Sequence, residues 1–223
     1  MIYEVRQETF LAGGEGSIAR LPLTKMGLPS SVSKWDHFAL AGRMFCLGET
    51  TVGTLIAASA ADAGGNVLTA PTIRFTVPTG TTVFPRELNV AFGAMGGTIN
   101  EISIIANNAN SYTSGGTAAA PVNVRTDSDA PATAVTNAYI AAGSAIIEAG
   151  LTTHRHLFKA SHPVAFAAGA GGDQIWNVDK VWEDLIPIVG PASFLIYIGA
   201  ATTAPTFLYS MRWVEIDTVS AIA

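Results

Sequence analysis

Residues 71–95 read PTIRFTVPTGTTVFPRELNVAFGAM, and this stretch decides the fold class. Apolar and polar residues alternate in it twice, at 73–77 and again at 88–92, which is the period-2 pattern of half-buried strands. Pro78 and the glycine two positions later supply the dihedral angles of a tight turn between the two runs. Pro85 has no N–H for a strand ladder, so we expect it at a strand start, a bulge or an exposed edge. The stretch predicts a pair of strands in an all-β protein.

Short strand-like segments continue along the rest of the chain. We expect strands at 37–47, 51–59, 71–78, 82–94, 98–107, 143–149, 153–160, 163–168, 183–189, 192–201 and 204–217. The segments 57–63 and 138–147 are the ones that suit short helical turns, and nothing between the strands has the pattern of a crossover helix. Many short strands, separated by Gly and Pro and not alternating with helices, predict an antiparallel β-sandwich, which we interpret as a single jelly roll with additions.

The chain divides into a central domain with an arm, an excursion and a tail. Its 223 residues suit one all-β domain. We expect 1–36 to be an extended N-terminal arm, 37–217 to be the jelly-roll sandwich and 218–223 to be a C-terminal tail. The segment 107–142 breaks the strand rhythm with small residues and few charges, which is typical either of a loop that packs against an identical copy or of a mobile surface loop.

The composition indicates a chain whose surface is covered by partners. Charged residues make up 13% of the sequence and hydrophobic residues 49%. Small domains that stay apart in solution carry roughly a quarter to a third charged residues on their surfaces. We therefore expect a homo-oligomer.

Charge and apolar runs exclude several partners. The net charge is −5, and the 12 basic residues are scattered singly, whereas nucleic-acid binders gather Lys and Arg into a stripe. The N-terminal residues lack the apolar core of a secretory signal, and the longest apolar run, 192–201, is too short for a membrane span. Cys46 is the single cysteine, which excludes an intrachain disulfide. We expect a protein that is made in a cytoplasm and has neither a nucleic-acid partner nor a membrane span.

Two residue pairs have the spacing of metal ligands. His154 and His156 are at i and i+2 of a predicted strand, so both imidazoles point to one face. The sequence places no third ligand beside them, and two strand histidines also suit a half-buried interface. Asp127 and Asp129 alternate like the oxygen ligands of a calcium loop, but the glycine and the distal glutamate of an EF-hand are missing. We predict no metal and no cofactor, and keep the two pairs as candidates.

The sequence contains no recognisable catalytic constellation. Glu183 and Asp184 are adjacent in a predicted strand, so their carboxylates point to opposite faces and cannot flank one glycosidic bond. Neither a Gly-x-Ser-x-Gly elbow nor a phosphate-binding loop occurs. We therefore expect a protein that is not an enzyme.

The tryptophans divide into core and surface candidates. Trp213 belongs to a period-2 series, which predicts that it lies in the core. The other members of the series are Phe207, Tyr209 and Met211. Trp176 and Trp182 remain for an interface, or for a ligand such as a sugar that stacks on an aromatic ring.

Three segments together resemble the virion structural proteins of tailed or icosahedral bacterial viruses. They are AGRMF at 41–45, VPTGTTVFPRELNVAF at 77–92 and GPASFLIYIGAATTAPTFLYSMRWVEI at 190–216. Similar proteins carry a Val-Pro-x-Gly-Thr turn before a strand with a proline, and they end in a strand with a Trp near a carboxylate, here Trp213 and Glu215. The resemblance covers residues 37–217 loosely.

The resemblance implies a jelly-roll subunit that assembles around a symmetry axis, often as a trimer, and forms or decorates an icosahedral capsid. We expect Arg86 and Glu87, which follow the turn at the sheet end, to meet a neighbouring subunit. The net negative charge disfavours a position against the genome and favours the capsid exterior, as in a turret, cement or decoration protein. The sequence leaves a major capsid role open as well. The alternative function is a carbohydrate-binding or receptor-binding sandwich that uses Trp176 or Trp182.

Overall fold

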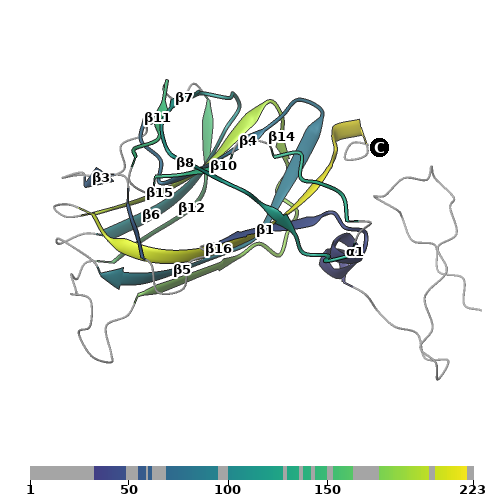
Figure 1. Cartoon of the computed structure of the whole chain (residues 1–223), viewed down its shortest axis with the longest axis horizontal. Helices are drawn as coiled ribbons and strands as arrows, with labels where there is room; N and C mark the ends of the chain where they lie inside the picture. The colour runs from purple at the N-terminus through teal and green to yellow at the C-terminus, as the bar shows by residue number, and fades with distance from the viewer. Residues whose placement is uncertain are drawn as a thin grey trace, which may run out of the picture.

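The protein is an all-β sandwich of two sheets (Figure 1). The computed structural model describes residues 33–48, 55–58, 60–61, 69–94, 100–127, 130–135, 138–141, 144–149, 153–162, 176–200 and 204–219. Neighbouring strands are antiparallel in these segments, except for one short parallel pair. The expected all-β class and antiparallel sandwich are therefore confirmed.

Each sheet has seven strands. The first sheet has the order β13 (Asn177–Val181), β5 (Thr81–Ala94), β16 (Thr206–Asp217), β1 (Met44–Gly48) and β9 (Val122–Asn123), with β14 (Ile188–Val189) beside β5 and β2 (Ile56–Ala57) beside β16. The second has the order β12 (His154–His162), β6 (Asn100–Asn107), β15 (Ala192–Ala200), β4 (Ile73–Val77), β10 (Ala138–Ile140) and β8 (Thr117–Ala119), with β3 (Ala60–Ala61) parallel to β15. A further pair, β7 (Tyr112–Ser114) and β11 (Ile147–Glu148), lies on the side of the second sheet away from the first (Figure 1).

The two alternating runs within residues 71–95 form β4 and β5, as predicted. Thr81 N donates to the carbonyl of Pro78 at 3.1 Å across the turn, and Gly80 has a φ of +85°, which favours glycine. In the ladder with β16, Pro85 is opposite Trp213 while Glu87 is opposite Arg212. One residue between them is therefore left without a partner, and Pro85 sits beside a β-bulge as its missing N–H requires.

The two sheets bury the hydrophobic core between them. Trp213 is fully buried, as its period-2 pattern predicted, and so are the other members of that series. Its ring stacks on Phe45 with centroids 6.4 Å apart and meets Phe75 edge-on at 5.0 Å. These aromatic contacts join both sheets, because Phe45 and Phe75 come from different ones.

The segment predicted as a strand over 37–47 begins instead with a helix, α1 (Lys34–Leu40). The hydroxyl of Ser33 caps it by accepting a hydrogen bond from Asp36 N at 3.1 Å. Its buried side chains, Trp35 and Phe38, belong to a second apolar cluster with residues of β1, β5 and β16. The strand prediction was wrong for 37–40 because an apolar residue at every third position also suits a helix face.

Four other local predictions were wrong. The described part of 57–63 contains the end of β2 and all of β3 rather than a helical turn. The segment 138–147 contains β10 and the start of β11 rather than a helical turn, and only 188–189 of the strand expected at 183–189 is paired. Residues 34–36, which we assigned to the arm, belong to α1. Residues 1–32, the strand expected at 163–168 and the end of the tail lie outside the described residues. Within the described residues no helix is long and apolar enough to cross a membrane.

Three strands of the 107–142 excursion, β8, β9 and β10, are built into the two main sheets, whereas β7 pairs with β11. β9 pairs with β1 of the first sheet, whereas β10 pairs with β4 of the second and carries β8 on its other side. Asn123 Nδ2 donates to the carbonyls of Gly42 at 2.7 Å and Pro131 at 3.0 Å. The excursion therefore extends the sandwich at one lateral edge.

Candidate interface and ligand residues

A buried polar cluster surrounds Arg74 on the outer face of the second sheet. The alternation of β4 turns Arg74 away from the core, as predicted, yet its side chain is 0% exposed. Arg74 Nε donates to Glu148 Oε1 at 2.6 Å, and Glu148 Oε2 accepts from Ser111 Oγ at 2.6 Å. Nη1 of Arg74 donates to Thr76 Oγ1 at 2.7 Å. Nη2 donates to Asn110 Oδ1 at 2.9 Å and to Ser193 Oγ at 3.2 Å.

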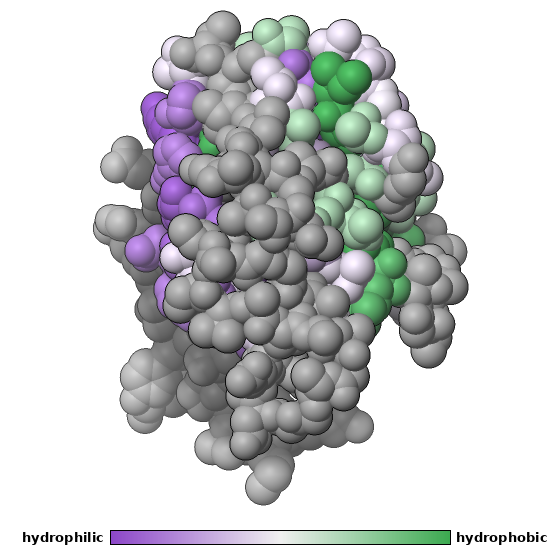
Figure 2. All heavy atoms as spheres, turned by 90° about the vertical axis from the view of Figure 1, so that its left-hand side faces the viewer, coloured by the Kyte–Doolittle hydropathy of each residue, from purple (hydrophilic) through white to green (hydrophobic). Residues whose placement is uncertain are grey.

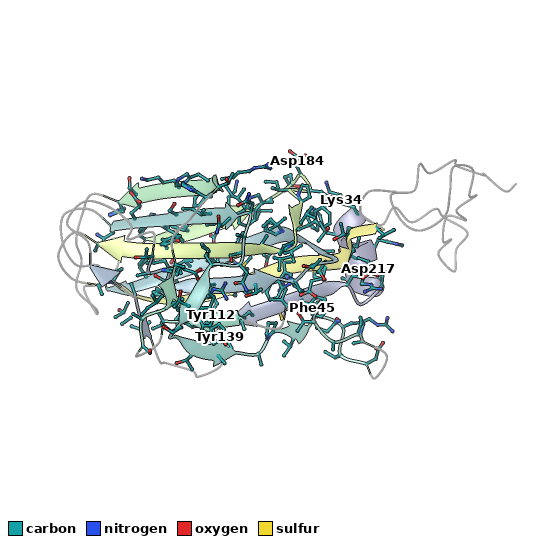
Figure 3. All side chains as sticks on the ribbon, turned by 90° about the horizontal axis from the view of Figure 1, so that it is seen from above. Lys34, Phe45, Tyr112, Tyr139, Asp184 and Asp217 are labelled. Atoms are coloured by element: carbon teal, nitrogen blue, oxygen red, sulfur yellow. The ribbon has the colours of Figure 1, made fainter. Side chains whose placement is uncertain are left out.

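Aromatic rings cover the same guanidinium. The Cζ atom of Arg74 lies 4.6 Å from the ring centroid of Tyr112, and Tyr112 stacks on Tyr139 with centroids 4.7 Å apart (Figure 3). Burial lowers the pKa of Arg74, and the Glu148 carboxylate opposes that shift. Four hydrogen bonds and one ring contact from this chain's own side chains hold the guanidinium, so the cluster fixes the segments around Tyr112 and Glu148 on the sheet.

An apolar patch lies beside this cluster on the same outer face. Ile105, Leu195 and Tyr197 form a buried group of their own, apart from the core between the sheets. Burial raises the pKa of Tyr197. The outer face of the second sheet is thus an interior along β4, β15 and β6, which the alternating sequence of β4 did not predict.

Trp213 and Glu215, the pair that carried part of the resemblance, are hydrogen-bonded to each other. Glu215 Oε1 accepts from Trp213 Nε1 at 2.8 Å and from Thr133 Oγ1 at 2.6 Å. The second oxygen, Oε2, accepts from the backbone N–H of Ala134 at 2.6 Å. This buried carboxylate therefore ties the end of the excursion to the first sheet.

Arg86 and Glu87, the predicted interface residues, make contacts within their own chain. Arg86 Cζ lies 4.9 Å from the ring of Trp35, and its Nη1 donates to the carbonyl of Trp182 at 3.1 Å. Glu87 Oε1 pairs with Arg212 Nε at 3.3 Å. Arg86 thus links α1 to the segment after β13. Whether a neighbouring subunit also meets these residues stays a prediction.

The two surface tryptophans lie at opposite ends of β13. Trp182 is only 4% exposed, so its ring presents no open face to a ligand in this chain. Trp176 is half-buried, stacks on Phe92 with centroids 4.7 Å apart, and has His162 at 5.5 Å. Both rings are therefore largely committed to contacts inside the protein.

The histidine pair is exposed, whereas the aspartate pair is only partly described. His154 and His156 lie on β12 with ring centroids 5.5 Å apart. Asp127 pairs with Arg125 at 2.7 Å, and Asp129 lies outside the described residues. Among the side chains that the structure describes, no group of three or more His, Cys, Asp and Glu could hold a metal ion.

Apolar residues are exposed beside the turn at Pro78, between β4 and β5. Val189 of β14 is 47% exposed and pairs with Thr82, the second residue of β5. Val219 is 81% exposed and follows Thr218, whose N–H donates to the carbonyl of Gly80 at 2.9 Å. β14 and the end of β16 lie at the same end of the sandwich (Figure 1). The opposite end, seen in Figure 2, has hydrophilic residues along one side and hydrophobic residues along the other.

In comparisons with known proteins, no family model, no curated protein and no solved structure matches this chain.

Proposed function

We propose that this chain is a non-enzymatic virion structural protein, a single jelly roll that forms or decorates an icosahedral capsid as a homo-oligomer. The observation that carries the proposal is the nested pairing of the strands that have five or more residues. In chain order these are β1, β4, β5, β6, β12, β13, β15 and β16. The first pairs with the last (β1 with β16), the second with the seventh (β4 with β15), the third with the sixth (β5 with β13) and the fourth with the fifth (β6 with β12).

Nested pairing is what a long antiparallel hairpin produces when it rolls up into two sheets of four strands. Here each of the four pairs lies within one sheet, and successive pairs alternate between the sheets. Jelly rolls of this kind build viral capsid subunits, and they also occur in lectins and cupins. The strand order therefore supports the architecture, and the role in a virion rests on the resemblance and on the surface.

The surface supports an assembly of copies. Val189 and Val219 are exposed beside the turn at Pro78, where we expected a neighbouring subunit. Exposed apolar groups are tolerated in subunits that bury them against a partner. The low share of charged residues agrees with that reading, and the net charge of −5 favours the capsid exterior over a position against the genome.

The alternative, a carbohydrate-binding or receptor-binding module, has less support. A sugar platform needs an aromatic face that is open to solvent. Trp182 is buried and Trp176 is covered by Phe92 on one side. No other observation on the described surface favours a sugar site over a protein interface.

Native mass of the purified chain tests the oligomer. We expect about three times the monomer mass of 23.1 kDa, and a stable monomer at micromolar concentration would contradict the proposal. Val189→Asp and Val219→Asp should each shift the mass toward the monomer, because a charge is costly in an apolar interface. Leu55→Asp is the matched control, since Leu55 is 39% exposed and directly precedes β2, which pairs with the start of β16, away from the turn. Detection of the chain in purified particles, with its position seen by imaging, tests the virion role separately.

A further inference from the structure

The edge strand β12 carries the two histidines side by side on the outer face of the second sheet. In the ladder with β6, His154 is opposite Asn107 and His156 is opposite Ile105, and both partners are buried on that face. Both imidazoles are exposed to solvent. We propose that His154 and His156 together bind one divalent first-row transition ion, such as Zn²⁺, Ni²⁺ or Cu²⁺, through one ring nitrogen each. This inference does not depend on the proposed function.

The spacing of the rings fits a shared ion. An imidazole nitrogen lies about 1.1 Å from its ring centre and a Zn–N bond is about 2.1 Å long, so two rings on one ion have centroids at most about 6.4 Å apart. A tetrahedral angle at the ion places them about 5.2 Å apart. The observed distance between the centroids of His154 and His156 is 5.5 Å. Side-chain rotation that turns one nitrogen of each ring toward a common point therefore completes the chelate without moving the backbone.

The neighbourhood supplies groups that orient metal-bound histidines. Ser103 Oγ lies 3.4 Å from Nδ1 of His156, which leaves Nε2 of that ring free for the ion. Asn107, across the ladder from His154, has a buried Oδ1 that accepts no hydrogen bond from the residues that the structure describes. Either a metal-bound water or the ring N–H of a metal-bound His154 would donate a hydrogen bond to this oxygen.

Two basic residues of β12, Lys159 and Arg155, do not place a free positive charge beside the two imidazoles. Lys159 Nζ is held by Glu101 Oε2 at 2.9 Å. Arg155 lies between the histidines in the sequence, so the alternation of a strand turns it to the other face. Two nitrogens fill two coordination positions, and water fills the rest, as in an open site. Imidazole nitrogen suits Zn²⁺, Ni²⁺ and Cu²⁺, whereas Ca²⁺ and Mg²⁺ prefer oxygen, so the site should discriminate between these two groups of ions.

The test is a titration of the full-length chain with Cu²⁺, Zn²⁺ and Ni²⁺ in turn, each followed by NMR of the imidazole signals. The chain has four histidines, and substoichiometric Cu²⁺ should broaden the signals of His154 and His156 and spare those of His37 and His162. His154→Gln or His156→Gln should each weaken binding by at least about tenfold, since one of two protein ligands is lost. His37→Gln replaces another exposed histidine and should leave binding unchanged. Mg²⁺ should cause no change.

Two results would overturn the proposal. One is binding weaker than about 1 mM for all three transition ions. The other is a double variant, His154→Gln with His156→Gln, that binds Cu²⁺ as tightly as the parent. Both side chains are exposed, so the variants should fold, and far-UV circular dichroism confirms this before the titration.

Discussion

Replacement of Glu148 by methionine leaves the guanidinium of Arg74 buried without its counter-charge. The two side chains are 0% exposed, and the N–O distance between them is 2.6 Å. Breaking a buried ion pair by removal of one partner costs about 3–5 kcal/mol. A second route gives the same size, because Glu148 accepts hydrogen bonds from Arg74 and Ser111, and each bond to a charged group contributes about 1.5–3 kcal/mol.

Urea and thermal unfolding, followed by circular dichroism, measure the effect. A loss of about 3–5 kcal/mol corresponds to a fall in Tm of roughly 6–20 °C in a domain of this size. Hydrogen exchange gives a local readout of the segment around Glu148. The backbone N–H of Glu148 donates to the carbonyl of Thr69, and that of Ala149 donates to the carbonyl of Ser111. Both amides should lose protection in the variant.

The exposed pair of Arg125 and Asp127 is the matched control. Its N–O distance is 2.7 Å, but the side chains are 32% and 52% exposed. Asp127→Met should therefore change the unfolding free energy by less than about 1 kcal/mol. A double variant, Arg74→Met with Glu148→Met, should lose much less than the sum of its single variants. If Glu148→Met lies within about 0.5 kcal/mol of the parent, or if the two changes simply add, then the reasoning about the buried pair is refuted.

Three further predictions concern single side chains. Glu215→Gln should lower the unfolding free energy in urea by about 1.5–3 kcal/mol and change the fluorescence of Trp213, because the carboxylate accepts three hydrogen bonds. Burial raises the pKa of Tyr197 in the folded chain. As the pH rises, the unfolded chain therefore loses the phenolic proton of Tyr197 at a lower pH than the folded chain does. Stability should then fall above about pH 10, by up to about 1.4 kcal/mol per pH unit, and Tyr197→Phe should flatten this dependence in unfolding curves measured at several pH values. Ser33→Ala should cost about 1 kcal/mol in thermal unfolding through loss of the α1 cap, and Ser33→Asp should not.

The patterned parts of the fold were predictable because their signals are local. The alternation in 71–95 indicated β4 and β5. The missing N–H of Pro85 indicated a strand start, a bulge or an exposed edge, and the register shows a bulge. The helix α1 was missed because its short apolar spacing suits helix and strand alike. The rings of His154 and His156 lie close together as the i, i+2 spacing required.

The cluster around Arg74 could not be read from the sequence in the same way. A charged residue that alternates with core residues normally marks a solvated face. Here Glu148, which is 74 positions away, and the segment around Tyr112 cover that face. The burial of Trp182 is likewise a product of distant segments, since its side chain belongs to the core cluster that residues of both sheets form.

The sequence by itself determined β4, β5, the turn at Pro78 between them and the side of each of these strands that faces the core. It could do so because side-chain direction follows from position along a strand and needs no distant partner. The tertiary structure decided which outward faces remain in water. The segments that cover the outer face of the second sheet, β7 and β11, belong to the long connection between β6 and β12. Only the tertiary fold places this connection, which also contains β10, beside β4. Burial of an outward residue depends on that placement, so Arg74 became interior while His154 and His156 stayed exposed.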